Sequence, residues 1–222
     1  MRIHSIVLPA TVVLCALIAQ SSRAAFVQFD TSIEFSSGTP PQGTPPWVRL
    51  RFDDAGPNTV TMKMTALNLV GQEFVTEWDF NLDPALNPNS LVFSAPTKTG
   101  TFADPTISKG VDAFKADGDG DYDVSFNFDN SPPANRFDAG DAVSYTITAP
   151  GLTANSFKFL SKPDGGAGPY YTAAHVQGVG QNGGFSGWVA PGPNDVQTPE
   201  PASAVVIGLG LVPLLARARR SR

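Results

Sequence analysis

The sequence predicts an all-β protein built around one β-sandwich domain. Three observations predict this class. Short segments in the middle of the chain alternate apolar and polar residues, which is the pattern of half-buried strands. Glycine and proline make up 41 of the 222 residues, more than the roughly 12% of an average protein, and they concentrate between these segments, where they favour turns. No stretch of this region keeps the 3.6-residue period of a helix for three turns.

Six segments are expected to form the strands. They are residues 47–52, 60–65, 74–82, 122–128, 143–147 and 157–159. In the third segment, Phe74, Trp78 and Phe80 share one side of the strand, whereas Glu77 and Asp79 share the other. Many short strands separated by turns rich in glycine and proline are typical of a sandwich, and we expect a jelly-roll-like arrangement.

Residues 1–24 are expected to be a signal peptide. Arg2 gives a positive start, residues 6–19 are apolar, and Ala24 ends the segment with a small residue, so signal peptidase is expected to cut between Ala24 and Ala25. The alternative is a retained N-terminal membrane anchor. The only cysteine, Cys15, lies in this segment, so the mature chain is expected to form neither disulfides nor thiolate metal sites.

The region between the two ends of the chain is acidic. Residues 25–198 number 174, enough for one domain with a sizeable core. They hold nine basic and 19 acidic residues, a net charge of −10, which disfavours nucleic-acid binding because that needs a basic surface. We expect the sandwich to cover residues 25–189. Residues 190–198 include Pro191 and Pro193, and we expect them to form a linker or stalk.

The last 24 residues, 199–222, have three parts. Pro199, Glu200 and Pro201 come first. An apolar run of 14 residues follows, which as a helix would span about 21 Å, short of the roughly 30 Å of a bilayer core. A membrane segment is expected at about 202–216. A basic cluster then predicts that the extreme C-terminus stays in the cytoplasm. Its members are Arg217, Arg219, Arg220 and Arg222.

This order of parts resembles the PEP-CTERM sorting signal of Gram-negative, exopolysaccharide-producing bacteria. In that family the tail is a temporary anchor, which a membrane enzyme called exosortase reads and cuts. The resemblance implies that Pro199, Glu200 and Pro201 are the recognition motif. It also implies a membrane-anchored precursor whose product reaches the cell envelope, the cell surface or the extracellular matrix. Thr198 stands where the family often has valine. A permanent tail anchor is the alternative.

One acidic turn is a candidate calcium site. Asp117, Asp119 and Asp121 alternate with glycines, so their carboxylates could converge on one hard cation. The turn starts like an EF-hand loop, but its sixth position is Tyr122 and its twelfth is Phe128, where that loop needs glycine and glutamate. The alternative is a solvated turn before a strand. We expect no other cofactor.

Other chemistry has weaker signals. His175 is the only histidine after the signal peptide, and we expect a structural imidazole that is hydrogen-bonded at a strand end. The three glutamates of the domain have no spacing that favours a pair for glycoside hydrolysis. They are Glu34, Glu73 and Glu77. Four aromatic residues are expected either to stack on sugars or to pack in the core. They are Trp47, Tyr170, Tyr171 and Trp188.

Together these observations predict an exported protein of the cell surface or matrix with a structural or adhesive, non-enzymatic role. The expected partners are signal peptidase, exosortase, the membrane before processing, and exopolysaccharide. A calcium-dependent carbohydrate-binding module of the exopolysaccharide matrix is the first alternative. A polysaccharide-active enzyme is the second.

Overall fold

The computed structural model describes residues 25–117 and 119–198. The predicted signal peptide and sorting tail lie outside these ranges. Within them the all-β prediction is confirmed, because thirteen strands and three short 3-10 helices account for the regular structure. No helix of this part of the chain is long and apolar enough to cross a membrane.

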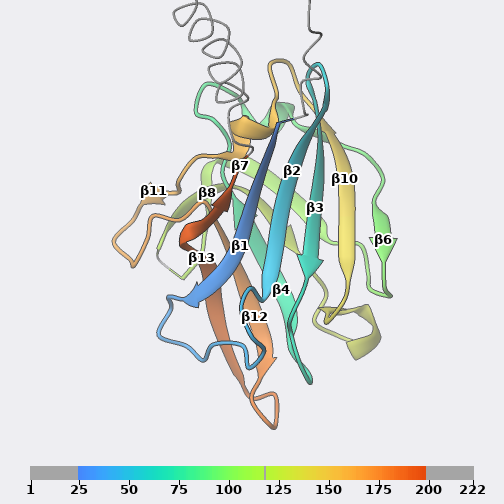
Figure 1. Ribbon diagram of the computed structural model, residues 1–222, viewed down its shortest axis with the longest axis vertical. Coiled ribbons are helices and arrows are strands. Elements are labelled where there is room, and N and C mark those ends of the chain that lie inside the picture. The colour runs from blue at the N-terminus through green and yellow to red at the C-terminus, as the bar shows by residue number, and fades with distance from the viewer. Residues whose placement is uncertain (1–24, 118, 199–222) are drawn as a thin grey trace, which may run out of the picture.

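The strands join into one antiparallel sheet. Figure 1 shows it with the longest axis of the molecule vertical. They are β1 (Phe26–Glu34), β2 (Val48–Gly56), β3 (Thr59–Ala66), β4 (Phe74–Phe80), β5 (Val92–Phe93), β6 (Thr97–Thr99), β7 (Thr106–Lys115), β8 (Gly120–Asn127), β9 (Phe137–Asp138), β10 (Ala142–Thr148), β11 (Lys162–Pro163), β12 (Thr172–Val179) and β13 (Phe185–Gln197). The 3-10 helices are η1 (Pro88–Ser90), η2 (Pro133–Asn135) and η3 (Ala154–Phe157). The order along the sheet is β11-β8-β4-β12-β13-β1-β2-β3-β10-β5.

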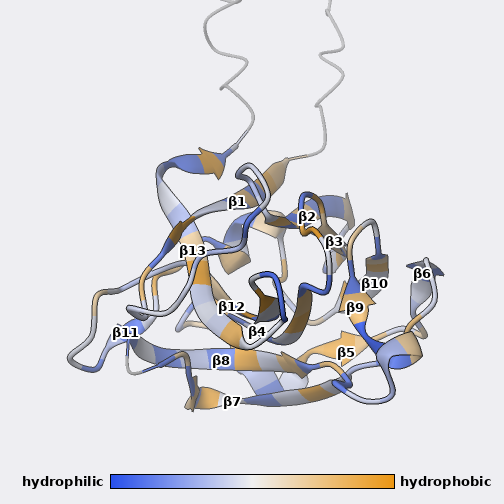
Figure 2. Cartoon of the chain, turned by 90° about the horizontal axis from the view of Figure 1, so that it is seen from below, coloured by the Kyte–Doolittle hydropathy of each residue, from blue (hydrophilic) through white to orange (hydrophobic). Residues whose placement is uncertain are grey.

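The sheet folds back on itself and gives a sandwich-like body. Figure 2 shows β1, β2 and β3 along one side and β7 and β8 along the opposite side. Aromatic side chains from the two sides meet between them: the ring centroids of Phe52 on β2 and Phe80 on β4 lie 5.4 Å apart, and those of Phe126 on β8 and Tyr145 on β10 lie 5.5 Å apart. One core therefore holds both halves of the sheet together.

Five of the six predicted strand segments lie in β2, β3, β4, β8 and β10. The sixth prediction, at residues 157–159, is wrong. Phe157 ends the 3-10 helix η3, which begins with a reciprocal capping box between Thr153 and Ser156. Phe157 is still fully buried, and its ring stacks on Phe52 at 3.9 Å. The spacing of Phe157 and Phe159 thus correctly indicated that Phe157 is buried, but it wrongly indicated a strand.

The predicted stalk at 190–198 is also wrong, because residues 190–197 form the second half of β13, which pairs with β1 at positions 190–191 and 196–197. Val196 lies opposite Phe29, and Gln197 lies opposite Gln28. Ala190 is fully buried. The register shifts twice along this pair, on either side of Thr31. Such irregularities let prolines stand in a strand without leaving a ladder bond unmade.

The pairing of β1 with β13 brings the two ends of the domain together. Phe26 starts the first strand, Gln197 ends the last, and the two strands run antiparallel. In Figure 1 both ends lie at the top of the domain, whereas the turn between β12 and β13 lies at the bottom. Whatever precedes Ala25 and follows Thr198 therefore joins the domain at the same end.

The effect of a charge at position 190 on stability tests whether residues 190–198 belong to the sheet or form a detached stalk. We expect Ala190→Asp to lower the free energy of unfolding by about 2–4 kcal/mol, because the new carboxylate would lose its hydration. Asn194→Asp adds the same charge at an exposed position of β13. It should change the free energy of unfolding by less than about 0.5 kcal/mol. Urea denaturation measures both. Equal values for the two variants would mean that residues 190–198 are detached from the sheet.

Candidate functional site

The acidic turn predicted to bind calcium leads from β7 into β8. Its carboxylates lie in different surroundings. Asp119 is only 1% exposed. Asp121 lies between two lysines, with its carboxylate oxygens 3.6 Å from Nζ of Lys115 and 3.8 Å from Nζ of Lys162. Asp117 has a left-handed backbone, with φ of 47°. In residues 25–117 and 119–198, no three acidic, histidine or cysteine side chains converge as metal ligands. Calcium binding at this turn stays a prediction.

Beside this turn the fold buries a second carboxyl group, which the sequence analysis assigned to the polar side of a strand. Asp79 on β4 is fully buried, and neither of its side-chain oxygens has a hydrogen-bond partner in the described residues. Burial raises the pKa of Asp79 well above its ordinary value, and the charges of Glu77 and Asp119 raise it further. The protonated, neutral form of Asp79 is therefore favoured.

Asp119 shares this environment. The hydroxyl of Tyr122 donates a hydrogen bond of 2.7 Å to Oδ2 of Asp119, whereas Oδ1 has no partner among the described residues. Burial raises the pKa of Asp119 to about 6, and it also raises the pKa of Tyr122. Asp79 and Asp119 therefore form a buried acidic pair, in which the charge of Asp119 adds to the rise in the pKa of Asp79.

The fold closes over this pair. Tyr122 and Trp188 belong to a small cluster of buried residues outside the main core. The loop that contains Gly168 lies so close that a Cβ at this position would be 2.8 Å from the carbonyl oxygen of Asp119. A fully buried carboxyl such as Asp79 has no direct access to a substrate. The buried acidic pair is therefore better suited to controlling stability than to catalysis.

His175 lies in the middle of β12 rather than at a strand end, so that part of the prediction is wrong. Its hydrogen bond is confirmed: Nδ1 lies 3.1 Å from the hydroxyl oxygen of Thr76. The imidazole stacks on Trp188 with ring centroids 4.9 Å apart and planes 11° from parallel. Burial lowers the pKa of His175, so the neutral ring is favoured at neutral pH. These contacts support a packing role.

The four aromatic residues considered for sugar stacking all pack against other parts of the protein. Trp47 is 5% exposed and donates its indole N–H to the carbonyl of Gly43 at 2.6 Å. Trp188 stacks on His175, as described above. The rings of Tyr170 and Tyr171 lie against Phe35 and Phe29, with centroids 4.7 and 5.4 Å apart. Core packing, the second alternative of the sequence analysis, describes these residues better.

A hollow of about 410 Å³ lies beside β11 and the chain that follows β4. Its lining is largely apolar and includes the exposed side chains of Val111 and Leu160. Asp123 contributes a carboxylate, but that group accepts hydrogen bonds from the backbone N–H groups of Leu82 at 2.9 Å and Asp112 at 3.0 Å. Asp123 therefore holds two chain segments in place, and nothing in the hollow selects one kind of ligand.

The buried acidic pair predicts an unusual pH dependence of stability. Because the pKa of Asp79 is higher in the folded than in the unfolded protein, its stabilising effect is complete below about pH 4 and is lost as the pH rises through the folded pKa. We expect Asp79→Asn to make the decline above about pH 5 shallower and to raise the free energy of unfolding at about pH 8 by roughly 1–3 kcal/mol.

Urea denaturation of both proteins across this pH range measures the effect. Asp129→Asn is the matched control, since Asp129 is exposed and its substitution should shift the curve little at any pH. Parallel curves for the wild type and Asp79→Asn would show that Asp79 is not held in its protonated form.

Comparisons of this chain with family models, with curated proteins and with solved structures find no match.

Proposed function

We propose that the protein is an exported, non-enzymatic component of the cell envelope, the cell surface or the extracellular matrix, sorted through its C-terminal tail. The observation that carries the proposal is the three-part order of residues 199–222: Pro199-Glu200-Pro201, an apolar run and an arginine cluster. Its resemblance to the PEP-CTERM signal makes exosortase the expected processing partner. The finer description of the sandwich as jelly-roll-like belongs to the same proposal.

The end of the sheet supports this role. Gln197 is the last residue of β13, so only Thr198 separates the folded domain from Pro199. Before cleavage the domain would therefore sit close to the membrane surface, with its opposite end turned outward. After cleavage near the motif, the product would be the sandwich with almost no trailing residues.

The acidic groups support a structural rather than a catalytic role. Glu34 accepts hydrogen bonds from the backbone N–H groups of Ser36 at 2.8 Å and Gly38 at 3.1 Å. Glu73 accepts them from Gln42 at 2.7 Å and Val70 at 2.8 Å. Both carboxylates thus hold loops in place, as Asp123 does, and Asp79 is closed off from solvent.

Intact mass of the protein from its native host tests the proposal. We expect a chain that begins near Ala25 and ends between Pro199 and Pro201. Replacing all three motif residues with alanine should leave the chain ending at Arg222 and held in the membrane fraction. Thr198→Ala, which changes only the preceding residue, should still be processed. A wild-type protein that keeps Arg222 would contradict sorting and indicate a permanent anchor.

Calcium-dependent carbohydrate binding is the second candidate. One observation favours it: Oδ1 of Asp119 is buried and has no partner within the described ranges, and a bound cation would supply one. If calcium binds, about 1 mM should raise the melting temperature by roughly 2–5 °C, because ligand binding stabilises only the folded state.

Asp121→Asn should abolish this increase, whereas Asp129→Asn, at an exposed acidic position outside the turn, should leave it unchanged. Differential scanning calorimetry measures the shift, and calorimetric titration measures the heat of binding. Neither heat nor a shift in the wild type would contradict calcium binding.

A further inference from the structure

A polar pocket lies at the end of the domain opposite the two chain ends. Its volume is about 380 Å³. Four segments far apart in the sequence line it: the turn before β4 with the first residue of that strand, the residue after η2, the end of β12, and the turn into β13 together with the start of that strand. Six side chains contribute to its lining: Gln72, Phe74, Arg136, Gln177, Phe185 and Ser186.

Arg136 is the charged group of this pocket. Its guanidinium carbon lies 4.0 Å from the centre of the Phe74 ring, and its Nε donates a hydrogen bond of 2.8 Å to the carbonyl of Asn130. None of the ion pairs within residues 25–117 and 119–198 includes Arg136. Stacking and one backbone contact therefore fix a guanidinium that forms no ion pair in this part of the chain. Its charge still acts on Asp138, where it partly offsets the rise in pKa that burial causes.

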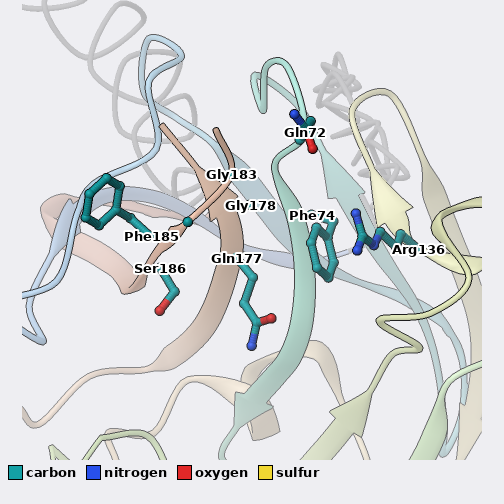
Figure 3. A pocket seen from close by; sticks show the side chains of 9 residues that line it. Gln72, Phe74, Arg136, Gln177, Gly178, Gly183, Phe185 and Ser186 are labelled. Carbon is teal, nitrogen blue, oxygen red and sulfur yellow. The ribbon is translucent and has the colours of Figure 1, made fainter. Parts of the chain in front are cut away.

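Neutral polar groups and one aromatic ring complete the lining. Figure 3 shows Gln177 between the Phe74–Arg136 pair on one side and Phe185 and Ser186 on the other. Phe185 is 63% exposed, although it is a large apolar side chain at a turn. In Figure 3 the ring of Phe185 points away from Gln177 and from the Phe74–Arg136 pair, so the polar groups of the pocket are those of Gln72, Arg136, Gln177 and Ser186.

Glycines allow the segments to meet here. Gly178 has a φ of 73°, and a Cβ at this position would lie 2.1 Å from the carbonyl oxygen of Gln72. Only glycine permits this backbone contact between β12 and the turn before β4. The close approach places the side chains of Gln72 and Gln177 in the lining of one pocket.

This combination selects a particular ligand chemistry. No side chain that lines the pocket is acidic, although the domain carries a net charge of −10. A guanidinium binds a carboxylate through two parallel hydrogen bonds. Side-chain amides and a hydroxyl suit sugar hydroxyls, because they can both donate and accept hydrogen bonds. We propose that this pocket binds a uronate-bearing saccharide, with Arg136 holding the carboxylate.

The position of the pocket fits this proposal. Phe185 and Ser186 begin β13, and Gln197 ends it. Since residues 189–197 lie opposite only residues 28–34 of β1, the strand separates the pocket from the tail by roughly 33 Å, ten steps of about 3.3 Å. A domain held by its tail would therefore present the pocket outward. The inference rests on the surface or matrix location proposed above. Its test measures binding alone, so a negative result would leave the sorting proposal standing.

Calorimetric titration of the full chain, purified in detergent, with tetragalacturonate tests the proposal. We expect binding, and we expect the fully methyl-esterified tetramer, which lacks the charges, to bind at least about tenfold more weakly. Arg136→Gln should weaken binding of the acid at least about tenfold, and Arg136→Lys by an intermediate factor, because lysine keeps the charge but not the paired donors.

Lys63→Gln is the matched control, because Lys63 is an exposed cation in the middle of β3. It should leave the affinity unchanged within about twofold. Melting temperatures of all variants report whether they fold. If Arg136→Gln does not fold, Gln177→Ala provides the test and should weaken binding by about threefold or more.

Three results would overturn the proposal. The first is equal affinity for the acid and its methyl ester. The second is that Lys63→Gln and Arg136→Gln change the affinity by the same factor. If Arg136→Gln does not fold, the same comparison is made between Lys63→Gln and Gln177→Ala. The third is equally tight binding of tetraglutamate, which would mean that the pocket recognises an acidic chain rather than a sugar.

Discussion

The pairing of β1 with β13 is the contact on which the rest of the sheet depends. In the strand order it joins β11-β8-β4-β12-β13 to β1-β2-β3-β10-β5, so it is the only backbone ladder between the two halves in the described part of the chain. The aromatic core then closes the two halves face to face. Without this pairing, the core would have to hold two separate sheets together by side-chain packing alone.

The same pairing determines which features lie at each end of the domain. It places both chain ends at one end of the sandwich and the turn between β12 and β13 at the other. A protein that is exported and then held or released by its tail needs such an arrangement if its opposite end is to meet other molecules. The pocket at Arg136 lies at that opposite end.

Acidic groups have two distinct functions in this domain. Some hold the backbone: Glu34, Glu73 and Asp123 each accept two backbone N–H groups. Others, Asp79 and Asp119, are buried with incomplete hydrogen bonding, which costs stability when they ionise. The net charge alone does not distinguish these two groups, because it counts a buried carboxyl and a solvated one equally.

Local pattern was enough to predict much of this structure. Alternation identified β2, β3, β4, β8 and β10, because a half-buried strand must repeat every two residues whatever its partners are. The three-part tail is likewise a purely local signal. The strand at 190–197 was missed, since two prolines there favour a linker and only pairing with β1 stabilises an extended conformation.

The candidate sites depended more on tertiary contacts. The sequence by itself determined the all-β class and the acidic charge, because each follows from residue types and local patterns along the chain. The three-part tail also follows from neighbouring residues, and its sorting role stays a proposal. Only the tertiary structure decided that Asp79 is enclosed, that Trp47 is buried, and that Arg136 and Gln177 line one pocket. Those properties depend on which segments meet, and that is set by strand order and register rather than by any one segment.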